Sequence, residues 1–349
     1  MDLLIINHRD LKHPKAGGAE EVIYQISRRL VKKGINVTWL AEQVDGLKRE
    51  EIIDDIRIIR KGNSLTLHLF SLREAKKHDI VIDSVAHAVP FYSFLVNKRN
   101  IALVHHVHQE VVKYELNWFL SKVVSTLERD IRNYNNVISV SNTTKKDLIE
   151  KLKVGEEKIK VIYNGIDHNK YKPGKKSDEP FILWIGRLKN YKNPLDAIEI
   201  AKRAKVKLVM AGGGELENII RNKIREVNGD YLGKIPEEEK IRLYQSSWVT
   251  LVTSFIEGWS MVTLEANSCG TPVIGYNRGS LPEIIKEGVN GYIIRYKDVE
   301  KAAEIIKELL RNESELKRLW KSSYEESLLY DWDKSANEYY EYLRSFSEK

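Results

Sequence analysis

The sequence has only one cysteine, Cys269, among 349 residues. A single thiol cannot form an intramolecular disulfide, and it cannot supply the ligands of a cysteine zinc site or an iron–sulfur cluster. Long apolar runs are also absent. The first one, residues 3–6, is too short for a signal peptide or a membrane span and suits a buried strand. We therefore expect a cytoplasmic chain.

Proline and glycine are too scarce for a disordered or collagen-like protein, because 8 and 20 residues stand against 42% hydrophobic and 31% charged positions. The net charge of +7 is modest. Its densest cluster, residues 170–176, contains a proline and a glycine, and we interpret it as an exposed linker. Because no basic helix with interleaved aromatic residues is present, we expect no nucleic-acid partner.

Short apolar runs alternate with longer amphipathic segments, which is the pattern of βαβ units around parallel sheets. The length favours two domains at about 100–200 residues each. We predict an α/β protein with two doubly wound, Rossmann-like domains, residues 1–173 and 177–331, and a last helix at 332–349 that could belong to either. The predicted strands are residues 3–6, 37–40, 56–59, 80–82, 101–104, 137–140 and 159–162, then 181–185, 207–210, 249–252, 272–275 and 292–294.

The glycines do not follow the nicotinamide-binding pattern, in which G-x-G-x-x-G comes directly after the first strand. Here residues 7–16 separate that strand from the pair Gly17 and Gly18, which precedes a helical pattern. An anion can approach bare backbone amides at such a helix start, where the helix dipole is positive. A flexible loop end explains the pair equally well.

Two cations follow the first strand of the second half. Arg187 comes directly after Gly186 at the strand's end, and Lys192 lies in the polar loop beyond it. Open parallel sheets bind ligands at this edge, and an arginine fork with a lysine suits a diphosphate when no metal supplies the charge. Ordinary surface charge is the other interpretation.

Two glutamates flank a predicted helix. Glu257 lies at a strand's end, and Glu265 lies in an apolar helical stretch, where a carboxylate is costly unless it is hydrogen-bonded. Eight helical residues rise ~12 Å, which is close to the distance from the sugar to the ribose of a folded nucleotide sugar. We expect both carboxylates to accept from sugar hydroxyls, with the helix N-terminus facing the diphosphate.

Together these motifs resemble the retaining glycosyltransferases of the GT-B type, the large group 4 family. The resemblance implies two Rossmann-like domains facing across a cleft, with the acceptor on the first, the donor mainly on the second, and the last helix packed back on the first. It implies a UDP- or GDP-sugar donor, transfer of a hexose-type sugar by front-face attack, and no cofactor or metal. The motifs that carry it are residues 16–20, 164–167, 186–187 with Lys192, Glu257 with Glu265, and 269–274.

The resemblance also implies roles for single residues. Arg187 and Lys192 neutralise the donor diphosphate, Glu257 contacts the transferred sugar, and Glu265 binds the ribose. His105, at the end of a first-domain strand, joins Arg187, Lys192 and Glu257 as catalytic, with His106 as the second choice. Implied donor-binding residues are Gly17, Gly18, Arg187, Lys192, Gly213, Lys234, Glu257, Gly258, Trp259, Ser260, Met261, Val262 and Glu265. Two departures from the family pattern are Ser260, where many members have glycine, and residues 212–215, which replace a glycine-proline ending.

Two patterns imitate metal sites. Asp331 and Asp333 form a D-x-D sequence, but a helix follows immediately, and an aspartate N-cap is the ordinary explanation. His105, His106 and His108 lie at a strand end, where neighbouring side chains point in different directions. We expect no metal at either.

The acceptor leaves little trace in the sequence. Segment 64–77 places leucines and a phenylalanine beside Arg73, Lys76 and Lys77. It could contact the inner face of an anionic membrane that carries a lipid-linked acceptor, or it could pack into the core. Two alternative functions stay open, a sugar-nucleotide epimerase of the same fold and a non-catalytic nucleotide-sugar sensor.

Overall fold

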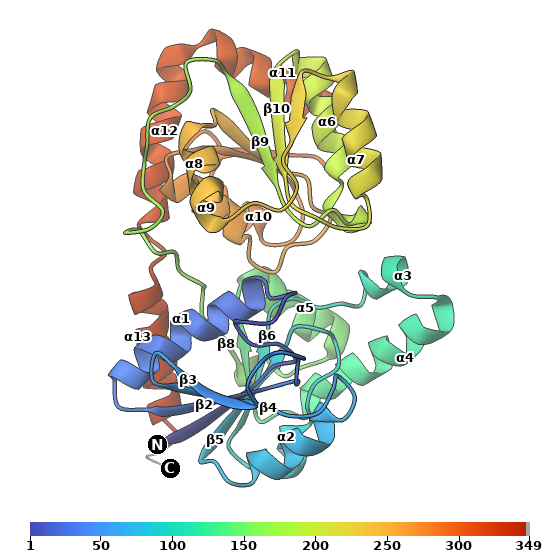
Figure 1. Ribbon diagram of the computed structural model, residues 1–349, viewed down its shortest axis with the longest axis vertical. Helices are drawn as coiled ribbons and strands as arrows, with labels where there is room; N and C mark the ends of the chain where they lie inside the picture. Colours follow the sequence, from blue (N-terminus) through green and yellow to red (C-terminus); the bar gives the residue numbers. More distant parts are fainter. Residues whose placement is uncertain (347–349) are drawn as a thin grey trace. The chain divides into compact units, whose positions relative to one another are not determined.

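The computed structural model describes residues 1–346, which divide into two compact units, each built on its own sheet (Figure 1). The first unit contains residues 1–165 and the segment that begins at Trp332, and the second contains Ile166–Asp331. The predicted α/β architecture of two doubly wound domains is confirmed. The chain enters the second unit earlier than the predicted boundary at 173–177.

The first unit has an eight-stranded sheet in the order β3-β4-β2-β1-β5-β6-β7-β8. All neighbours are parallel except β3 and β4, which form an antiparallel hairpin at one edge. The strands are β1 (Asp2–Ile6), β2 (Asn36–Ala41), β3 (Glu50–Ile53), β4 (Ile56–Arg60), β5 (Ile80–Val85), β6 (Asn100–Val104), β7 (Asn136–Ser139) and β8 (Ile159–Val161).

Strand β3 was not predicted, because its edge position leaves it half-exposed and without an apolar run. Its connection to β4 is the tight turn Asp54–Asp55, in which both residues have positive φ, 47° and 62°. This is the backbone that two-residue hairpin turns require. Turn geometry therefore forms the hairpin where hydrophobic patterning gives no signal.

Helices cover the first unit's sheet, and the last helix of the chain is one of them (Figure 1). Helix α13 packs against α1, and Arg29 of α1 forms an ion pair with Asp333. The helical segments are α1 (Gly18–Lys32), α2 (Leu67–Ala75), η1 (Ser93–Leu95), α3 (Val112–Glu115), α4 (Trp118–Glu128), η2 (Arg129–Asn133), α5 (Asn142–Leu152), η3 (Glu156–Lys158) and α13 (Trp332–Arg344).

The second unit has a six-stranded, wholly parallel sheet in the order β11-β10-β9-β12-β13-β14. Its strands are β9 (Phe181–Ile185), β10 (Lys207–Ala211), β11 (Gly229–Tyr231), β12 (Val249–Val252), β13 (Val273–Tyr276) and β14 (Gly291–Ile294). Its helical segments are η4 (Asn190–Lys192), α6 (Pro194–Ala204), α7 (Glu217–Lys223), η5 (Ile224–Glu226), α8 (Glu237–Ser246), α9 (Met261–Ser268), α10 (Leu281–Ile284), α11 (Val299–Arg311) and α12 (Glu313–Ser327).

The strand order of the second unit reverses at β9. The chain runs outward from β9 through β10 to β11, and then returns to β12 on the other side of β9. The helices that make these crossovers diverge at this point, so the carboxyl ends of β9 and β12 border a crevice where open parallel sheets bind ligands. The loops after these two strands are therefore where a site is expected.

The basic cluster at 170–176 is only partly the exposed linker that the sequence suggested. Residues 172–175 are exposed and form no helix or strand. Tyr171, however, is buried, and the ammonium of Lys176 donates to Thr271 and lies 5.5 Å from the Trp320 ring. Tyr171 and Lys176, on either side of the exposed residues, are thus packed into the second unit.

Candidate functional site

The loop after β9 is held in place by Thr253, at the end of β12. The Thr253 hydroxyl donates to the carbonyls of Lys192 and Asn193 at 2.8 and 3.0 Å, and it accepts from the indole nitrogen of Trp184 at 3.0 Å. Asn193 adopts a left-handed conformation directly before Pro194, the first residue of α6. Because a proline at this position fixes φ and needs no amide partner, the helix starts sharply and Lys192 is left at the sheet edge.

Lys192 forms an ion pair with Glu257. Its Nζ lies 2.6 Å from Glu257 Oε1, and the Ser254 hydroxyl donates to the same oxygen at 2.7 Å. The two charged side chains are only 18% and 13% exposed. Burial is the largest single effect and lowers the pKa of Lys192, but Glu257 and Tyr191 together outweigh it, so the net shift of the Lys192 pKa is upward. The alternative interpretation of Lys192 as an ordinary surface charge therefore does not hold, because the side chain is mostly buried and paired.

Arg187 is the exposed cation of this group. Within residues 1–346 its guanidinium has no hydrogen-bond or ion-pair partner, and its positive charge lowers the pKa of Lys192 to a small extent, which places the two cations near each other. A fork-shaped donor beside a paired lysine can bind an anion with two or more oxygens.

The start of α9 adds backbone donors. Ser260 is the N-cap, and its hydroxyl accepts from the amide of Thr263 at 3.3 Å. Serine is among the preferred N-cap residues, so this departure from the family's glycine preserves the helix start. The next residues, Met261 and Val262, are partly exposed, and their amides belong to the first turn, whose N–H groups have no intrahelical acceptor.

The spacing between the two glutamates differs from the prediction of eight helical residues. The helix begins only at Met261, so Glu257 lies in the preceding loop. The helical rise from Ser260 to Glu265 is ~7.5 Å rather than ~12 Å. Trp259, in the same loop, is buried and packs edge-on against Tyr330 with ring centroids 5.2 Å apart. Its side chain therefore contributes to the packing of the second unit.

Glu265 is the centre of a buried hydrogen-bond network. Its Oε1 accepts from Lys240 at 2.9 Å and from the Tyr171 hydroxyl at 3.2 Å, while its Oε2 accepts from the Tyr244 hydroxyl at 2.9 Å. Lys240 and Tyr171 also contact Glu237, and these cationic and hydroxyl partners help to hold the pKa of Glu237 at about 2 against the effect of burial. The network satisfies the buried carboxylate and leaves one acceptor position on Oε2.

Three glycines after β10 bring the neighbouring loops close together. Gly212 has φ of +130°, and a Cβ there would lie 1.8 Å from the Gly186 carbonyl oxygen. Gly214 has φ of +157°, and its Cβ would lie 2.6 Å from the Leu188 oxygen. At Gly213 a Cβ would only meet the flexible side chain of Lys234, at 3.0 Å. The loop that carries Arg187 therefore packs directly against the backbone of Gly212 and Gly214.

Several residues that position the glutamates were not found from the sequence. Gly279, after β13, has φ of +55°, and a Cβ there would lie 2.4 Å from the Glu257 carbonyl oxygen. The amide of Ser280 donates to that oxygen at 2.8 Å. The others are Ser254 and Thr253 beside Glu257 and Lys192, and Tyr171, Lys240 and Tyr244 around Glu265. None belongs to a local motif, so only the fold identifies them.

In the first unit, Gly17 and Gly18 begin α1. The amide of Gly17 donates to Glu20 Oε2 at 2.6 Å, and Oε1 of the same buried carboxylate accepts from Asn7 at 2.7 Å. Gly17 therefore has its amide engaged, whereas a Cβ at Gly18 would meet no atom within 4 Å. Of the predicted pair, Gly18 has open space beside its Cα, and its proposed contact with a ligand stays a prediction.

The segment 7–16 is anchored rather than a loose loop end. Asp10 accepts two hydrogen bonds from the Arg60 guanidinium, at 2.6 and 2.9 Å, and both side chains are fully buried. This paired, buried geometry holds the approach to α1 in a defined conformation.

Of the three strand-end histidines, His105 points away from the other two, whereas the rings of His106 and His108 lie against each other. His105 Nε2 lies 3.0 Å from the Ser84 hydroxyl, and burial with two nearby imidazoles lowers the pKa of His105 to about 4. His108 instead contacts Glu128 through Nδ1 at 3.1 Å, and the His106 ring packs against the His108 ring at a tilt, with centroids 3.9 Å apart. His105 is thus neutral near pH 7, and its catalytic role stays a prediction.

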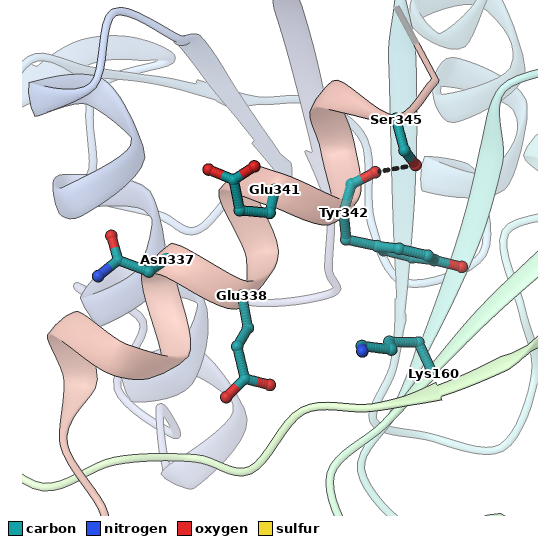
Figure 2. Close-up of a pocket in the computed structure, with 6 residues that line it drawn as sticks. All are labelled: Lys160, Asn337, Glu338, Glu341, Tyr342 and Ser345. Carbon is teal, nitrogen blue, oxygen red and sulfur yellow. Dashed lines mark hydrogen bonds between the residues drawn. The ribbon is translucent and has the colours of Figure 1, made fainter. Parts of the chain in front are cut away.

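The pocket beside α13 holds none of the predicted site residues. Figure 2 shows a pocket of about 550 Å³ between β8 and α13, where Glu338 and Glu341 point in different directions and Tyr342 lies near Lys160. Among the described residues, no group of three His, Cys, Asp or Glu side chains is arranged to hold a metal ion. No helix within residues 1–346 has the length and apolar character needed to span a membrane.

Two family models match the chain. The model described as Glycosyl transferases group 1 matches residues 165–326, and the one described as Glycosyltransferase Family 4 matches residues 16–170. The chain is 30% identical over 229 residues, 58% of each protein, to an uncharacterized glycosyltransferase of Methanocaldococcus jannaschii. It is 25% identical over 372 residues, 94% of each, to spore coat protein SA of Bacillus subtilis. The first of these matches spans less than two thirds of the relative's length.

Solved structures share the fold over the whole chain. Sucrose-phosphate synthase from Thermosynechococcus elongatus superimposes with a TM-score of 0.83 at 20% identity and covers 100% of both chains. HepE of Anabaena, in complex with UDP-glucose, superimposes with a TM-score of 0.78 at 20% identity and covers 99% of this chain and 100% of that one.

Proposed function

We propose that this chain, which belongs to the glycosyltransferases of GT-B fold, moves a hexose-type sugar from a nucleoside diphosphate to an acceptor with retention of configuration. Its second half, residues 165–326, is the part that matches the group 1 glycosyltransferases. The observation that carries the proposal is the grouping of Arg187, the Lys192–Glu257 ion pair and the start of α9 at one end of the second unit's sheet. These are the groups that a departing diphosphate needs nearby.

Charge stabilisation is the main catalytic contribution in this proposal. As the bond between the anomeric carbon and the diphosphate oxygen breaks, negative charge grows on the leaving group. The Arg187 fork, the Lys192 ammonium and the first amides of α9 offset that charge, and one such donor contributes about 3–4 kcal/mol in other enzymes. The acceptor oxygen bonds to the same face of the sugar, and its proton passes to the diphosphate, so no side-chain nucleophile is required.

The two glutamates differ in how many hydrogen bonds they can still accept from a bound nucleotide sugar. Glu257 Oε1 is occupied by Lys192 and Ser254, and Oε2 has no partner within residues 1–346, so it can accept from a hydroxyl of the transferred sugar. Glu265 has one acceptor position left on Oε2 and can take a ribose hydroxyl. We propose these roles for them, with Gly213 and Lys234 beside the phosphates.

The donor and acceptor are proposed by class. UDP-sugars are the first choice over GDP-sugars, because HepE, which shares the fold, is a complex with UDP-glucose. The acceptor is a sugar or a lipid-linked sugar, which places the enzyme in the cytoplasm or at the inner face of the membrane. The epimerase and the sensor are not favoured by the family matches.

Transfer to water tests the reaction without a known acceptor. With UDP-glucose or GDP-mannose in excess EDTA, we expect slow release of the nucleoside diphosphate and of a sugar that first appears in the donor's anomeric configuration, measured by proton NMR. Turnover should survive the chelator, because Arg187 and Lys192 supply positive charge that a metal would otherwise provide.

Other outcomes of this experiment would contradict the proposal. Activity lost in EDTA and restored by manganese would contradict metal independence. A new nucleotide sugar without free nucleoside diphosphate would indicate the epimerase, and binding without any turnover would indicate the sensor. Heat-unfolded protein is the control for spontaneous hydrolysis.

A further inference from the structure

Glu265 lies inside α9, yet the donors that the described chain provides for its carboxylate all come from outside that helix. The side chain is 12% exposed, and its neighbours Leu264 and Ala266 are buried. A carboxylate in such surroundings is costly unless donors satisfy it. Two of its donors, Lys240 and Tyr244, belong to α8, which packs beside α9 (Figure 1). Helix α8 therefore has a direct influence on how Glu265 is presented.

Tyr171 cannot satisfy Glu265 on its own, because it faces two carboxylates. Its hydroxyl lies 3.2 Å from Glu265 Oε1 and forms a shorter hydrogen bond with Glu237. Burial, together with the two carboxylates, raises the pKa of Tyr171 well above its usual value, so the phenol keeps its proton. A phenol has only one proton to donate. Oε1 of Glu265 therefore needs a second donor.

Lys240 supplies both that donor and a positive charge. Its Nζ lies 2.9 Å from Glu265 Oε1 and 3.2 Å from Glu237 Oε2, and an ammonium has three N–H groups, enough for both. Burial is the largest effect on the pKa of Lys240 and lowers it, but Glu265 and Glu237 together outweigh it, so the net shift is upward. Glu237 has a second cation, Lys170 at 2.8 Å. Glu265 has no ion pair except that with Lys240 within residues 1–346.

Lys240 and Tyr244 hold the Glu265 carboxylate at two points. They are four residues apart on α8 and therefore lie on the same face of that helix. Lys240 donates to Oε1, whereas Tyr244, which is fully buried, donates to Oε2 at 2.9 Å. The terminal torsion of a glutamate is otherwise broad. Two donors on different oxygens fix the plane of the carboxylate, and with it the direction of the acceptor position left on Oε2.

Loss of the Lys240 ammonium would weaken one particular contact of a ligand. Oε1 would then share a single phenol proton with Glu237, and the Glu265 carboxylate would rotate or take up a proton. A hydrogen bond to an ionised acceptor is roughly twice as strong as one between neutral groups. A ligand hydroxyl that bonds to Oε2 is therefore held less strongly, whereas the parts of the ligand that lie elsewhere keep their contacts.

We propose that Lys240 is a positioning residue of the nucleotide site, which keeps the Glu265 carboxylate ionised and oriented so that Oε2 accepts from a ribose hydroxyl. The proposal rests on the proposed function, because it takes Glu265 as the group that meets the ribose. Lys240 acts through Glu265 and needs no contact of its own with the nucleotide. Selection against nucleotides that lack the hydroxyl should therefore depend on Lys240.

Calorimetric titration of the full chain with UDP, 2′-deoxy-UDP and 3′-deoxy-UDP tests the proposal; the matching guanosine nucleotides are used if the wild type binds only GDP. We expect the wild type to bind at least one deoxy nucleotide ~10-fold or more weakly than its parent, as for loss of a hydrogen bond to a charged group. In Lys240→Met this ratio should fall below ~2-fold, because the parent binds more weakly while the affinity for the deoxy nucleotide is unchanged. Lys240→Arg keeps the charge and several donors and should restore a ratio of at least ~5-fold.

Two further variants separate positioning from stability. Glu237→Gln leaves the ion pair between Lys240 and Glu265 intact and should keep the wild-type ratio. Lys286→Met removes a lysine that pairs with Glu326 elsewhere in the second unit, and it should bind all three nucleotides like the wild type. Thermal unfolding of each variant shows whether the protein is folded.

The outcomes separate the positioning role from the proposed function. A Lys240→Met variant that keeps the wild-type ratio, or that binds all three nucleotides more weakly by one common factor, overturns the positioning role alone. If Lys240→Met does not fold, loss of the ratio in Glu237→Gln overturns it. A wild type that binds the parent and both deoxy nucleotides equally well contradicts the ribose contact of Glu265 and overturns the proposal as well. Wild-type protein that binds neither UDP nor GDP counts against the proposed function itself, and the positioning role is then overturned with it.

Discussion

Replacing Arg187 with alanine should lower turnover of the nucleotide-sugar donor by at least ~100-fold while changing the free energy of unfolding by less than ~1 kcal/mol. The guanidinium is exposed and has no partner within the described chain, so the fold does not depend on it. Lys192→Ala should lower turnover by a similar factor but also destabilise the second unit by about 1–3 kcal/mol, since it leaves the buried Glu257 carboxylate without its cation.

The contrast between the two variants is the informative result. Donor turnover and urea unfolding are measured on both, with Arg203→Ala as the control for loss of an exposed arginine that pairs with Glu199 and Glu300. Arg203→Ala should keep wild-type turnover. An Arg187→Ala variant with near wild-type turnover would contradict the role of Arg187 at the diphosphate. A Lys192→Ala variant as stable as the wild type would contradict the stabilising role of its ion pair with Glu257.

Gly212→Ala should destabilise the second unit by about 3 kcal/mol or more. The new Cβ would lie 1.8 Å from the Gly186 carbonyl oxygen, and φ at this position is +130°. The neighbour is backbone, so a side-chain rotation cannot relieve the clash, and the loop before Arg187 must move. Any protein that still folds should therefore bind nucleoside diphosphate weakly.

Thermal and urea unfolding of Gly212→Ala provide the measurement, and Gly18→Ala is the matched control. A Cβ at Gly18 meets no atom within 4 Å, so that variant should stay within ~0.5 kcal/mol of the wild type. Equal stability of the two glycine variants would contradict the close approach of the β9 and β10 loops.

The fold was accessible from the sequence because buried parallel strands are continuous apolar runs. The sequence predicts strands at residues 181–185 and 249–252, for example, and the structure has β9 and β12 at these positions. The two strands that escaped prediction, β3 and β11, are short, half-exposed edge strands. Their positions are fixed by a turn and by pairing with one neighbour, neither of which leaves an apolar pattern.

The candidate site was predictable where its residues stand in local motifs. Arg187, Lys192 and Glu257 follow strand ends, and strand order alone brings those ends together. The partners of Glu265 could not be found in this way, because Tyr171 and Lys240 come from distant segments and meet only through packing. The burial of Lys192 has the same origin, since it depends on Ser254 and Glu257 across the loop.

Helix α4 shows a further limit of periodicity. A helix with apolar residues at spacings of three and four is normally a core-facing helix, and residues 118–128 fit that pattern. The pattern states which residues share a face but not what covers it. Only the structure shows that Trp118 and Phe119 are left exposed.

The central claim is that the loops after β9 and β12 bind a nucleoside diphosphate, and calorimetric titration tests it most directly. UDP and GDP are titrated into the full wild-type chain and into the double variant Arg187→Ala/Lys192→Ala. We predict that the wild type binds at least one of them, and that the double variant binds that nucleotide at least ~100-fold more weakly, a loss of about 2.7 kcal/mol or more. Equal affinity of the two proteins, or no binding of either nucleotide to the wild type, would contradict the account.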